Sequence, residues 1–199
     1  MTAVQLVAGL GNPGSKYAET RHNAGFWFVE ELARRYNAHF GPDGRHKSEV
    51  ARCTVLGHDL RLQKPQDFMN RSGLPVASLA GFYQIPRQSI LIVHDELDLP
   101  VGCARLKKDG GHGGHNGLRD LITHLGGNDF LRLRIGIGHP GHKDDVTGHV
   151  LKPASREDRE QIDKAIDAAI GVLPDLLSGK IEAAMKTLHT SGQGAPRAP

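Results

Sequence analysis

The sequence has little or nothing of several features that mark large classes of protein. It contains no run of about 18 or more consecutive apolar residues, so we expect no membrane-spanning helix. Its N-terminus has no basic segment followed by an apolar stretch and a small-residue cleavage site, so we expect no export signal. It has only two cysteines, Cys53 and Cys103, without the C-x-x-C spacing of redox and zinc sites. These absences favour a cytoplasmic protein with buried, reduced thiols.

Metal-binding motifs are also missing, although 12 histidines are present. No H-E-x-x-H pair occurs, and that is the spacing by which one helix face holds zinc. The run GGHGGHNG at residues 110–117 has no carboxylate in register with its histidines. A metal-dependent hydrolase remains an alternative because five residues offer nitrogen and oxygen ligands: His94, Asp95, Glu96, His112 and His115. We nevertheless expect no metal and no cofactor, and activity that survives a chelator would exclude this alternative.

What the chain does have is the composition of one ordinary globular domain. Its 199 residues are 38% hydrophobic and 24% charged, which suits a domain whose core needs no disulfide or metal. Its formal net charge of +3 is compatible with a nucleic-acid or phosphate-bearing partner. The excess is too small to identify one.

Apolar residues recur with helical and strand periods in alternation along the chain. Helices are predicted at residues 24–36, 74–83, 118–125 and 181–188, and from the capping box at Ser155 to Leu173. Strands are predicted at residues 4–8, 50–56, 60–63, 89–93 and 130–137, with a hairpin turn at 57–59. This alternation predicts an α/β fold, a single-domain three-layer sandwich with a twisted, mostly parallel mixed sheet flanked by helices. We expect one domain at residues 1–190 and a disordered C-terminal tail at residues 191–199.

A glycine-rich stretch, VAGLGNPG at residues 7–14, follows the first predicted strand. Its G-x-G-x-x-G spacing is that of the dinucleotide-binding fingerprint. In a dinucleotide-binding fold, however, a helix begins directly at the glycines, and here the helical pattern begins only near Ala24. The stretch instead predicts a tight loop that presents Asn12 and leads to His22.

Polar side chains gather in four stretches, each at the end of a predicted strand: residues 12–23, 64–70, 94–98 and 107–117. Ligands of open α/β sheets bind at the carboxyl ends of strands, so we expect the four stretches to meet in one crevice. Taken singly, Asn12 also suits a glycine turn, and His22 or Asp95 suits a helix cap. The glycines of residues 110–117 are harder to explain in this way, because they cost entropy and are favoured where backbone approaches a ligand closely.

At these four stretches the chain resembles the bacterial-type peptidyl-tRNA hydrolases. The resemblance rests on GLGNPGSKYAETRHNAGF, KPQDFMNRSG, HDELDLPVG, GGHGGHNGLR and RLRIGIGHP, in this order between Leu6 and about Lys152. Two positions depart from the family pattern. Asp67 stands where the family often has Thr, and Asp109 replaces the first of three glycines, beside Lys107 and Lys108. Neither is among the residues expected to carry the chemistry.

The resemblance implies cleavage of the ester that joins a peptide, or an N-acylated amino acid, to the 3′ end of tRNA. Such an enzyme recycles tRNA from peptides that drop off or stall in translation. It implies His22 as general base on water and Asp95 as the carboxylate that orients it. The implied partners are the acceptor stem and CCA end of peptidyl-tRNA and a stalled large ribosomal subunit. We expect a cytoplasmic monomer without membrane contact.

Further residues take roles from the resemblance. Asn12 would sense whether the α-amino group is acylated. Asn70 and Asn116 would hold the peptide backbone or the terminal nucleotide and polarise the carbonyl, and the sequence does not assign which amide does so. Tyr17, Phe68 and Met69 would line the pocket for the CCA end, although Phe68 and Met69 also suit a core. Lys107 and Arg134 would contact tRNA phosphates, in two regions that also hold Arg105, Lys108 and Arg132.

A second alternative is a non-catalytic RNA-binding module that keeps this fold. The presence of both His22 and Asp95 favours the enzyme. A release assay with N-acetylated aminoacyl-tRNA separates the two classes.

Overall fold

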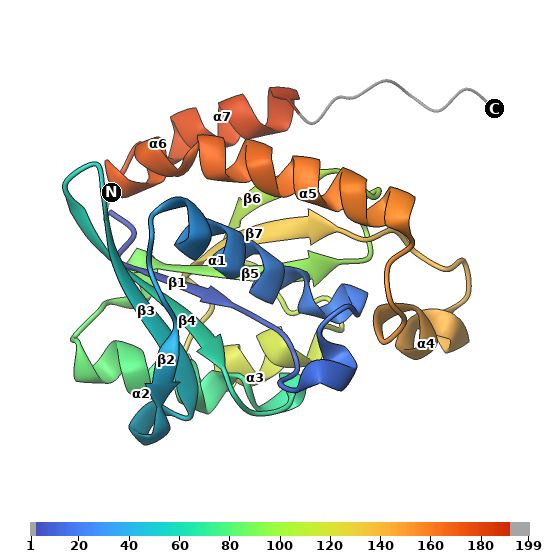
Figure 1. Cartoon of the computed structure of the whole chain (residues 1–199), viewed down its shortest axis with the longest axis horizontal. Helices are drawn as coiled ribbons and strands as arrows, with labels where there is room; N and C mark the ends of the chain where they lie inside the picture. Colours follow the sequence, from blue (N-terminus) through green and yellow to red (C-terminus); the bar gives the residue numbers. More distant parts are fainter. Residues whose placement is uncertain (1–2, 192–199) are drawn as a thin grey trace.

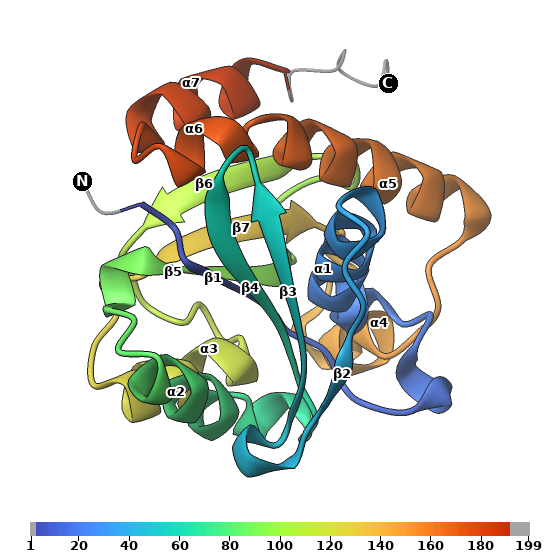
Figure 2. The same ribbon diagram turned by 60° about the vertical axis from the view of Figure 1, so that its left-hand side comes forward.

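The computed structural model describes residues 3–191, and these form a central sheet with helices on both faces (Figures 1 and 2). The strands are β1 (Leu6–Gly9), β2 (Gly41–Asp43), β3 (Ser48–Val55), β4 (His58–Pro65), β5 (Ile90–Glu96), β6 (Ala104–Lys108) and β7 (Leu131–Gly136). Within this described part of the chain they form one seven-stranded sheet of order β2-β3-β4-β1-β5-β7-β6. Strands β4, β1, β5 and β7 are parallel neighbours. β3 pairs antiparallel with β4, and β6 pairs antiparallel with β7. The predicted mixed, mostly parallel sheet is confirmed.

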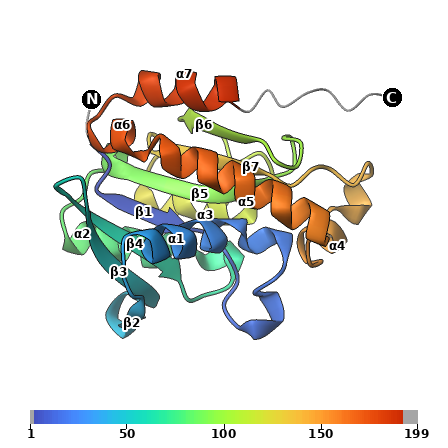
Figure 3. The ribbon, with the colours of Figure 1, turned by 45° about the horizontal axis from the view of Figure 1, so that its top comes forward.

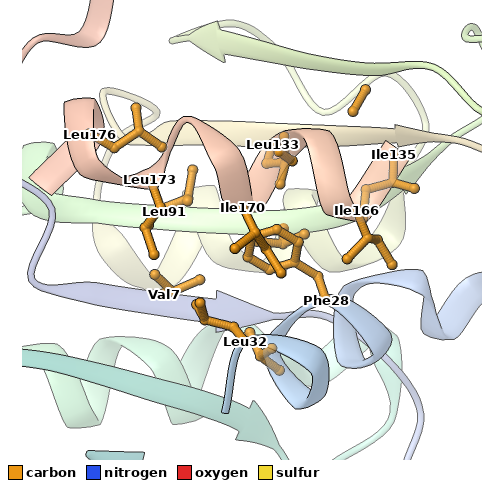
Figure 4. Close-up of a cluster of buried hydrophobic side chains, with 14 of the residues drawn as sticks. Val7, Phe28, Leu32, Leu91, Leu133, Ile135, Ile166, Ile170, Leu173 and Leu176 are labelled. Atoms are coloured by element: carbon orange, nitrogen blue, oxygen red, sulfur yellow. The ribbon is translucent and has the colours of Figure 1, made fainter. Parts of the chain in front are cut away.

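The helices cover the sheet in two groups. They are α1 (Ala24–Arg35), α2 (Gly73–Phe82), α3 (Asn116–Leu125), α4 (Val146–Val150), α5 (Arg156–Gly171), α6 (Leu173–Leu177) and α7 (Ile181–Ser191). One core joins α1, α5, α6 and α7 to Leu91 and Val93 of β5. Figure 4 shows part of this core. The other core joins α2 and α3 to Ile90 and Ile92 of the same strand. Successive side chains of a strand point to opposite faces, so a strand between two helical layers is apolar throughout.

Most boundaries lie close to the prediction. The hairpin between β3 and β4 turns at Leu56 and Gly57, both with positive φ (49° and 84°). The hydroxyl of Ser155 accepts a hydrogen bond from the amide of Asp158 at 3.0 Å, which is the expected N-cap of α5. Ser191, predicted as the start of the tail, is the last residue of α7, and the rest of that tail lies outside the described residues.

Two glycines let α1 approach the sheet very closely. A Cβ atom on Gly25 would lie 2.3 Å from the carbonyl oxygen of Val93, and one on Gly9 would lie 2.2 Å from the carbonyl oxygen of Gly25. The glycine spacing near the N-terminus therefore serves helix-on-strand packing, which agrees with rejecting a dinucleotide site. This packing fixes the short turn Arg21–Asn23, directly before α1, above the end of β5.

The outermost strand β6 is covered by α7 (Figure 3). The ring Nε2 of His189 accepts the amide hydrogen of Leu106 at 3.1 Å, and the Arg105 guanidinium donates to the His189 carbonyl at 2.6 Å. Burial and the charge of Arg105 lower the pKa of His189, which keeps the ring neutral and able to accept. Of the helices in residues 3–191, none has both the length and the hydrophobicity needed to cross a bilayer.

Candidate active site

Three of the polar stretches lie at the carboxyl ends of the parallel strands β1, β4 and β5, as expected. The fourth follows the antiparallel β6 and reaches the same place only through residues 112–116. In Figure 1 the arrowheads of β1, β5 and β7 point toward the side where α4 lies. A cleft of about 630 Å³ opens there. From the predicted site it is lined by Asn12, His22, Phe68, Met69, Asn70, Asp95 and Asn116. Its far wall comes from residues 139–151, which include α4; only His139 and Pro140 among them belong to a sequence motif, RLRIGIGHP.

His22 and Asp95 form a close pair at this cleft. The Nδ1 atom of His22 lies 2.9 Å from Oδ1 and 3.0 Å from Oδ2 of Asp95. The side chain of His22 is 14% exposed, and that of Asp95 only 2%. Because a carboxylate accepts hydrogen bonds, Nδ1 carries the proton and Nε2 of His22 is left with its lone pair.

The pKa values of the pair move apart. Burial lowers the pKa of His22, but the charge of Asp95 and the hydrogen bond to it raise it by more, so it lies above its ordinary value. Burial raises the pKa of Asp95, yet the charges and hydrogen bonds of His22 and His115 lower it far more. The carboxylate is therefore ionised at neutral pH, and it favours the imidazolium form of His22.

His115 is a second partner of the same carboxylate, whereas its sequence context predicts it only as a ligand in the metal alternative. Its Nε2 lies 2.9 Å from Oδ1 of Asp95. Its Nδ1 accepts the amide hydrogens of Gly117 and Leu118, at 3.2 and 3.3 Å, and so caps α3. With Nδ1 occupied as an acceptor, Nε2 must carry the proton and donate to Asp95. A histidine as N-cap is unusual, so this cap could not be predicted from the residue type.

These hydrogen bonds also argue against a metal ion at this group. Ligand atoms of His22, Asp95 and His115 lie within 4.8 Å of one another, which is close enough to suggest a metal site. A cation at Nε2 of His115 would displace its proton while Nδ1 still accepts two amide hydrogens, which would leave an imidazolate or break the cap of α3. The group fits two donated hydrogen bonds better than it fits a metal ion.

His94 is buried beside this group and stays neutral. Its Nδ1 donates to the carbonyl of Asp95 at 2.8 Å, and its ring packs edge-on against His115 with centroids 5.1 Å apart. Burial lowers the pKa of His94 to about 3. It is a packing neighbour and not a second base.

Asn12 has a fixed orientation at the cleft and is only 6% exposed. The backbone amide of Asn12 donates to Oδ1 of Asn23 at 2.8 Å, and Nδ2 of Asn23 donates to the backbone carbonyl of Asn12 at 2.9 Å. Its own Oδ1 accepts the amide hydrogen of Met69 at 2.7 Å. The side-chain oxygen is thus used, and Nδ2 is the atom that Asn12 can offer to a ligand.

The remaining predicted pocket residues differ in exposure. Asn70, in the turn Met69–Arg71, and Asn116, the first residue of α3, are both exposed to the cleft. Phe68 is 55% exposed, and its ring meets that of Tyr17 edge-to-face at 6.4 Å. Met69 is 4% exposed, so it belongs to the core as well as to the cleft wall.

The five basic residues of β6 and β7 separate into different environments. Lys107 is exposed, whereas Arg134 is half-buried and donates through Nε to Glu96 at 2.9 Å. Arg105 bonds to His189, and Lys108 forms an ion pair with Glu182. Arg132 is buried and points under the glycine loop.

Together, this fold and site define a hydrolase built on an α/β sheet, with a histidine–carboxylate pair in a cleft flanked by side-chain amides. The family model described as peptidyl-tRNA hydrolase matches residues 6–196. The chain belongs to the peptidyl-tRNA hydrolase family.

Its relatives are similar over nearly their whole length. A peptidyl-tRNA hydrolase of Pseudomonas savastanoi pv. phaseolicola is 55% identical, over 96% of this chain and 98% of its own. One of Acidithiobacillus ferrooxidans is 56% identical, over 93% of this chain and 98% of its own. The crystal structure of peptidyl-tRNA hydrolase from Acinetobacter baumannii superposes with a TM-score of 0.92 at 50% identity, covering 95% of this chain and 96% of that one. The predicted resemblance is confirmed.

Proposed function

We propose that this chain hydrolyses the ester between the peptide and the 3′ end of tRNA, with His22 as general base on water. The observation that carries this proposal is the 2.9 Å contact of His22 Nδ1 with Asp95, which leaves Nε2 with a lone pair at the cleft. An ester is activated enough for a deprotonated water to attack it without a covalent enzyme intermediate.

In the proposed reaction, His22 first accepts a proton and later returns it. Nε2 of His22 takes a proton from water while the oxygen attacks the ester carbon, and the imidazolium is stabilised by Asp95. The oxyanion accepts hydrogen bonds from amide groups of the cleft, with Asn70 and Asn116 as donors. When the intermediate collapses, the C–O bond to the ribose breaks and the 3′ oxygen takes the proton back from His22. The products are a free peptide and a tRNA with an intact 3′ hydroxyl.

Asn12 supplies discrimination in this proposal. Its Oδ1 is held by the amide of Met69, so Nδ2 meets the substrate as a hydrogen-bond donor. The carbonyl of an acylated α-amino group accepts such a bond, whereas a free α-ammonium group offers only donors. Peptidyl-tRNA would therefore be bound and ordinary aminoacyl-tRNA spared.

The tRNA would be held at two places. Phe68 and Tyr17 are aromatic surfaces for bases of the CCA end, next to Met69. Lys107 and Arg134 lie on the neighbouring strands β6 and β7 and would contact phosphates of the acceptor stem. Their loss should weaken binding of the whole tRNA and spare the chemical step.

We also propose the setting in which this activity operates. The chain would act as a single-domain monomer in the cytoplasm, without a metal or membrane, on peptidyl-tRNA and on stalled large ribosomal subunits. Support comes from the family membership and from the two cores that share one sheet.

The deciding experiment is release of N-acetylated amino acid from tRNA, followed in parallel for the wild type and His22→Asn. Release by the wild type and its near-absence in the variant are expected, with activity unchanged by a chelator. Binding of tRNA without release would support the RNA-binding module instead.

A further inference from the structure

Arg132 belongs to the group of basic residues on β6 and β7 that could meet tRNA phosphates, but its side chain is buried. It is 2% exposed on β7. Its Nη1 donates to the carbonyl of Gly111 at 2.6 Å and its Nη2 to the carbonyl of Gly110. Its guanidinium lies 5.0 Å from the centroid of the Phe130 ring. A cation enclosed in this way does not meet a phosphate of bound tRNA, although Lys107, directly opposite on β6, is exposed.

The two carbonyls belong to a loop that is conformationally costly to order. The loop joins β6 to α3 and has positive φ at four positions: Asp109, Gly110, Gly113 and Gly114. Glycine-rich backbone loses more conformational freedom on folding than any other, so one conformation needs anchors. The loop end is held by His115 on Asp95, and the loop start by Arg132.

The cleft is lined by His112, which lies between these anchors, by His115 itself, and by Asn116, which follows it. We infer that Arg132 is a positioning residue, which holds the loop start so that His115 meets Asp95 and Asn116 faces the substrate. The inference rests on the proposed function for the role of those two residues. The planar fork of arginine suits two successive carbonyls, which a lysine ammonium would not match.

The cost of this placement supports a positioning role. Burial, and next the charge of Arg134, lower the pKa of Arg132. A buried cation is not needed for stability, since an apolar side chain of similar volume is often as good. Its hydrogen bonds to the loop are what an apolar side chain would lack.

The test compares Arg132→Lys and Arg132→Met with Lys107→Met, on full-length peptidyl-tRNA and on a minimal substrate that ends in CCA. Both Arg132 variants should lower kcat by about 10- to 100-fold on both substrates, as expected for a displaced catalytic group. KM and the salt dependence of binding should not change. Lys107→Met should instead raise KM for the full-length substrate only. Arg52→Met, at an exposed site far from the cleft, is the matched control.

A pH profile separates positioning from mere loss of folded protein. Without the His115 hydrogen bond, the charge of Asp95 acts more fully on His22 and raises its pKa. The acid limb of the kcat profile should then move to higher pH in both Arg132 variants. A smaller folded fraction would lower the rate and leave the limb in place.

Two results would overturn the inference. One is unchanged kcat and limb in a folded Arg132 variant, and the other is an effect confined to KM and salt slope on the long substrate. If Arg132→Met does not fold, Arg132→Lys decides, because it keeps the charge. His22→Ala, assayed in parallel, identifies the failing step: active His22→Ala contradicts the proposed function, whereas inactive His22→Ala with normal Arg132 variants contradicts only this inference.

Discussion

At the scale of single residues, one carboxylate receives two histidine N–H groups with different duties. His22 has Nε2 free of the carboxylate, as the proposed reaction requires, while both nitrogens of His115 are already engaged. The sequence identified His22 and Asp95 because they stand in motifs at predicted strand and helix ends. It did not reveal that His115 completes the group, because that contact depends on how the glycine loop folds back.

Replacing the base tests the first of these duties. His22→Ala should lower kcat by about 10² to 10⁴-fold, the usual contribution of a positioned general base, with little change in KM. Single-turnover release from peptidyl-tRNA measures the effect. His124→Ala, at an exposed position on α3, is the control. Near-normal turnover of His22→Ala would leave His22 without a catalytic role.

Removing the charge of Asp95 tests its influence on His22. Asp95 raises the pKa of His22, and the base must be deprotonated to act. The kcat of the wild type should therefore decline on acidification around a pKa that is higher than the ordinary histidine value. In Asp95→Asn the imidazolium loses this stabilisation, and the acid limb of the kcat profile should move to lower pH. The maximal rate should fall too, because the tautomer is no longer fixed. A limb that stays in place would show that Asp95 does not tune His22.

At the scale of elements, periodicity predicted the long helices and the buried strands well. It missed β2 and β6, and for physical reasons. β2 has only three residues and contains Pro42, which an outermost strand tolerates. β6 does alternate, with the buried Ala104 and Leu106 between Arg105 and Lys107, but it has only five residues and only two apolar ones, so its periodic signal is short.

The close approach of α1 to the sheet can be tested with one methyl group. Gly25→Ala places a Cβ against backbone atoms of Leu10 and Val93, which cannot move aside easily. We expect a lower Tm and a lower kcat, because α1 and the turn that carries His22 must shift. Gly81→Ala in α2 meets nothing within 4 Å and should raise stability by about 0.5–1 kcal/mol. Equal Tm values for the two variants would contradict the packing argument.

The cations of β6 and β7 give the next prediction at this scale. Arg134→Ala should raise KM for full-length peptidyl-tRNA, spare kcat and flatten the salt dependence, because fewer counterions are released. A minimal CCA-ended substrate should respond little. Equal losses on both substrates, with an unaltered salt slope, would return Arg134 to the role of a partner for Glu96.

At the scale of the whole molecule, the convergence of the stretches after β1, β4 and β5 on one cleft was predictable, since parallel strands place their carboxyl ends together. The arrival of residues 112–116 was not, because they follow the antiparallel β6. The far wall from residues 139–151 was not. That segment contains the five-residue α4 and a short turn, too brief for a periodic signal. It begins with His139 and Pro140, the last residues of the motif RLRIGIGHP, but nothing in that motif indicates that the chain turns back over the cleft.

The packing of α7 on β6 has a consequence for the behaviour of the protein in concentrated solution. Without that helix, the free amides of an outermost strand would form a template on which a second copy could add its own strand. A chain that ends at Gly179 should therefore self-associate as its concentration rises, measurable by light scattering. A chain that ends at Ser191 keeps α7 and should scatter like the full-length protein. In this prediction α7 protects the protein against aggregation, and the neutral ring of His189 occupies a strand amide that another molecule would otherwise bind.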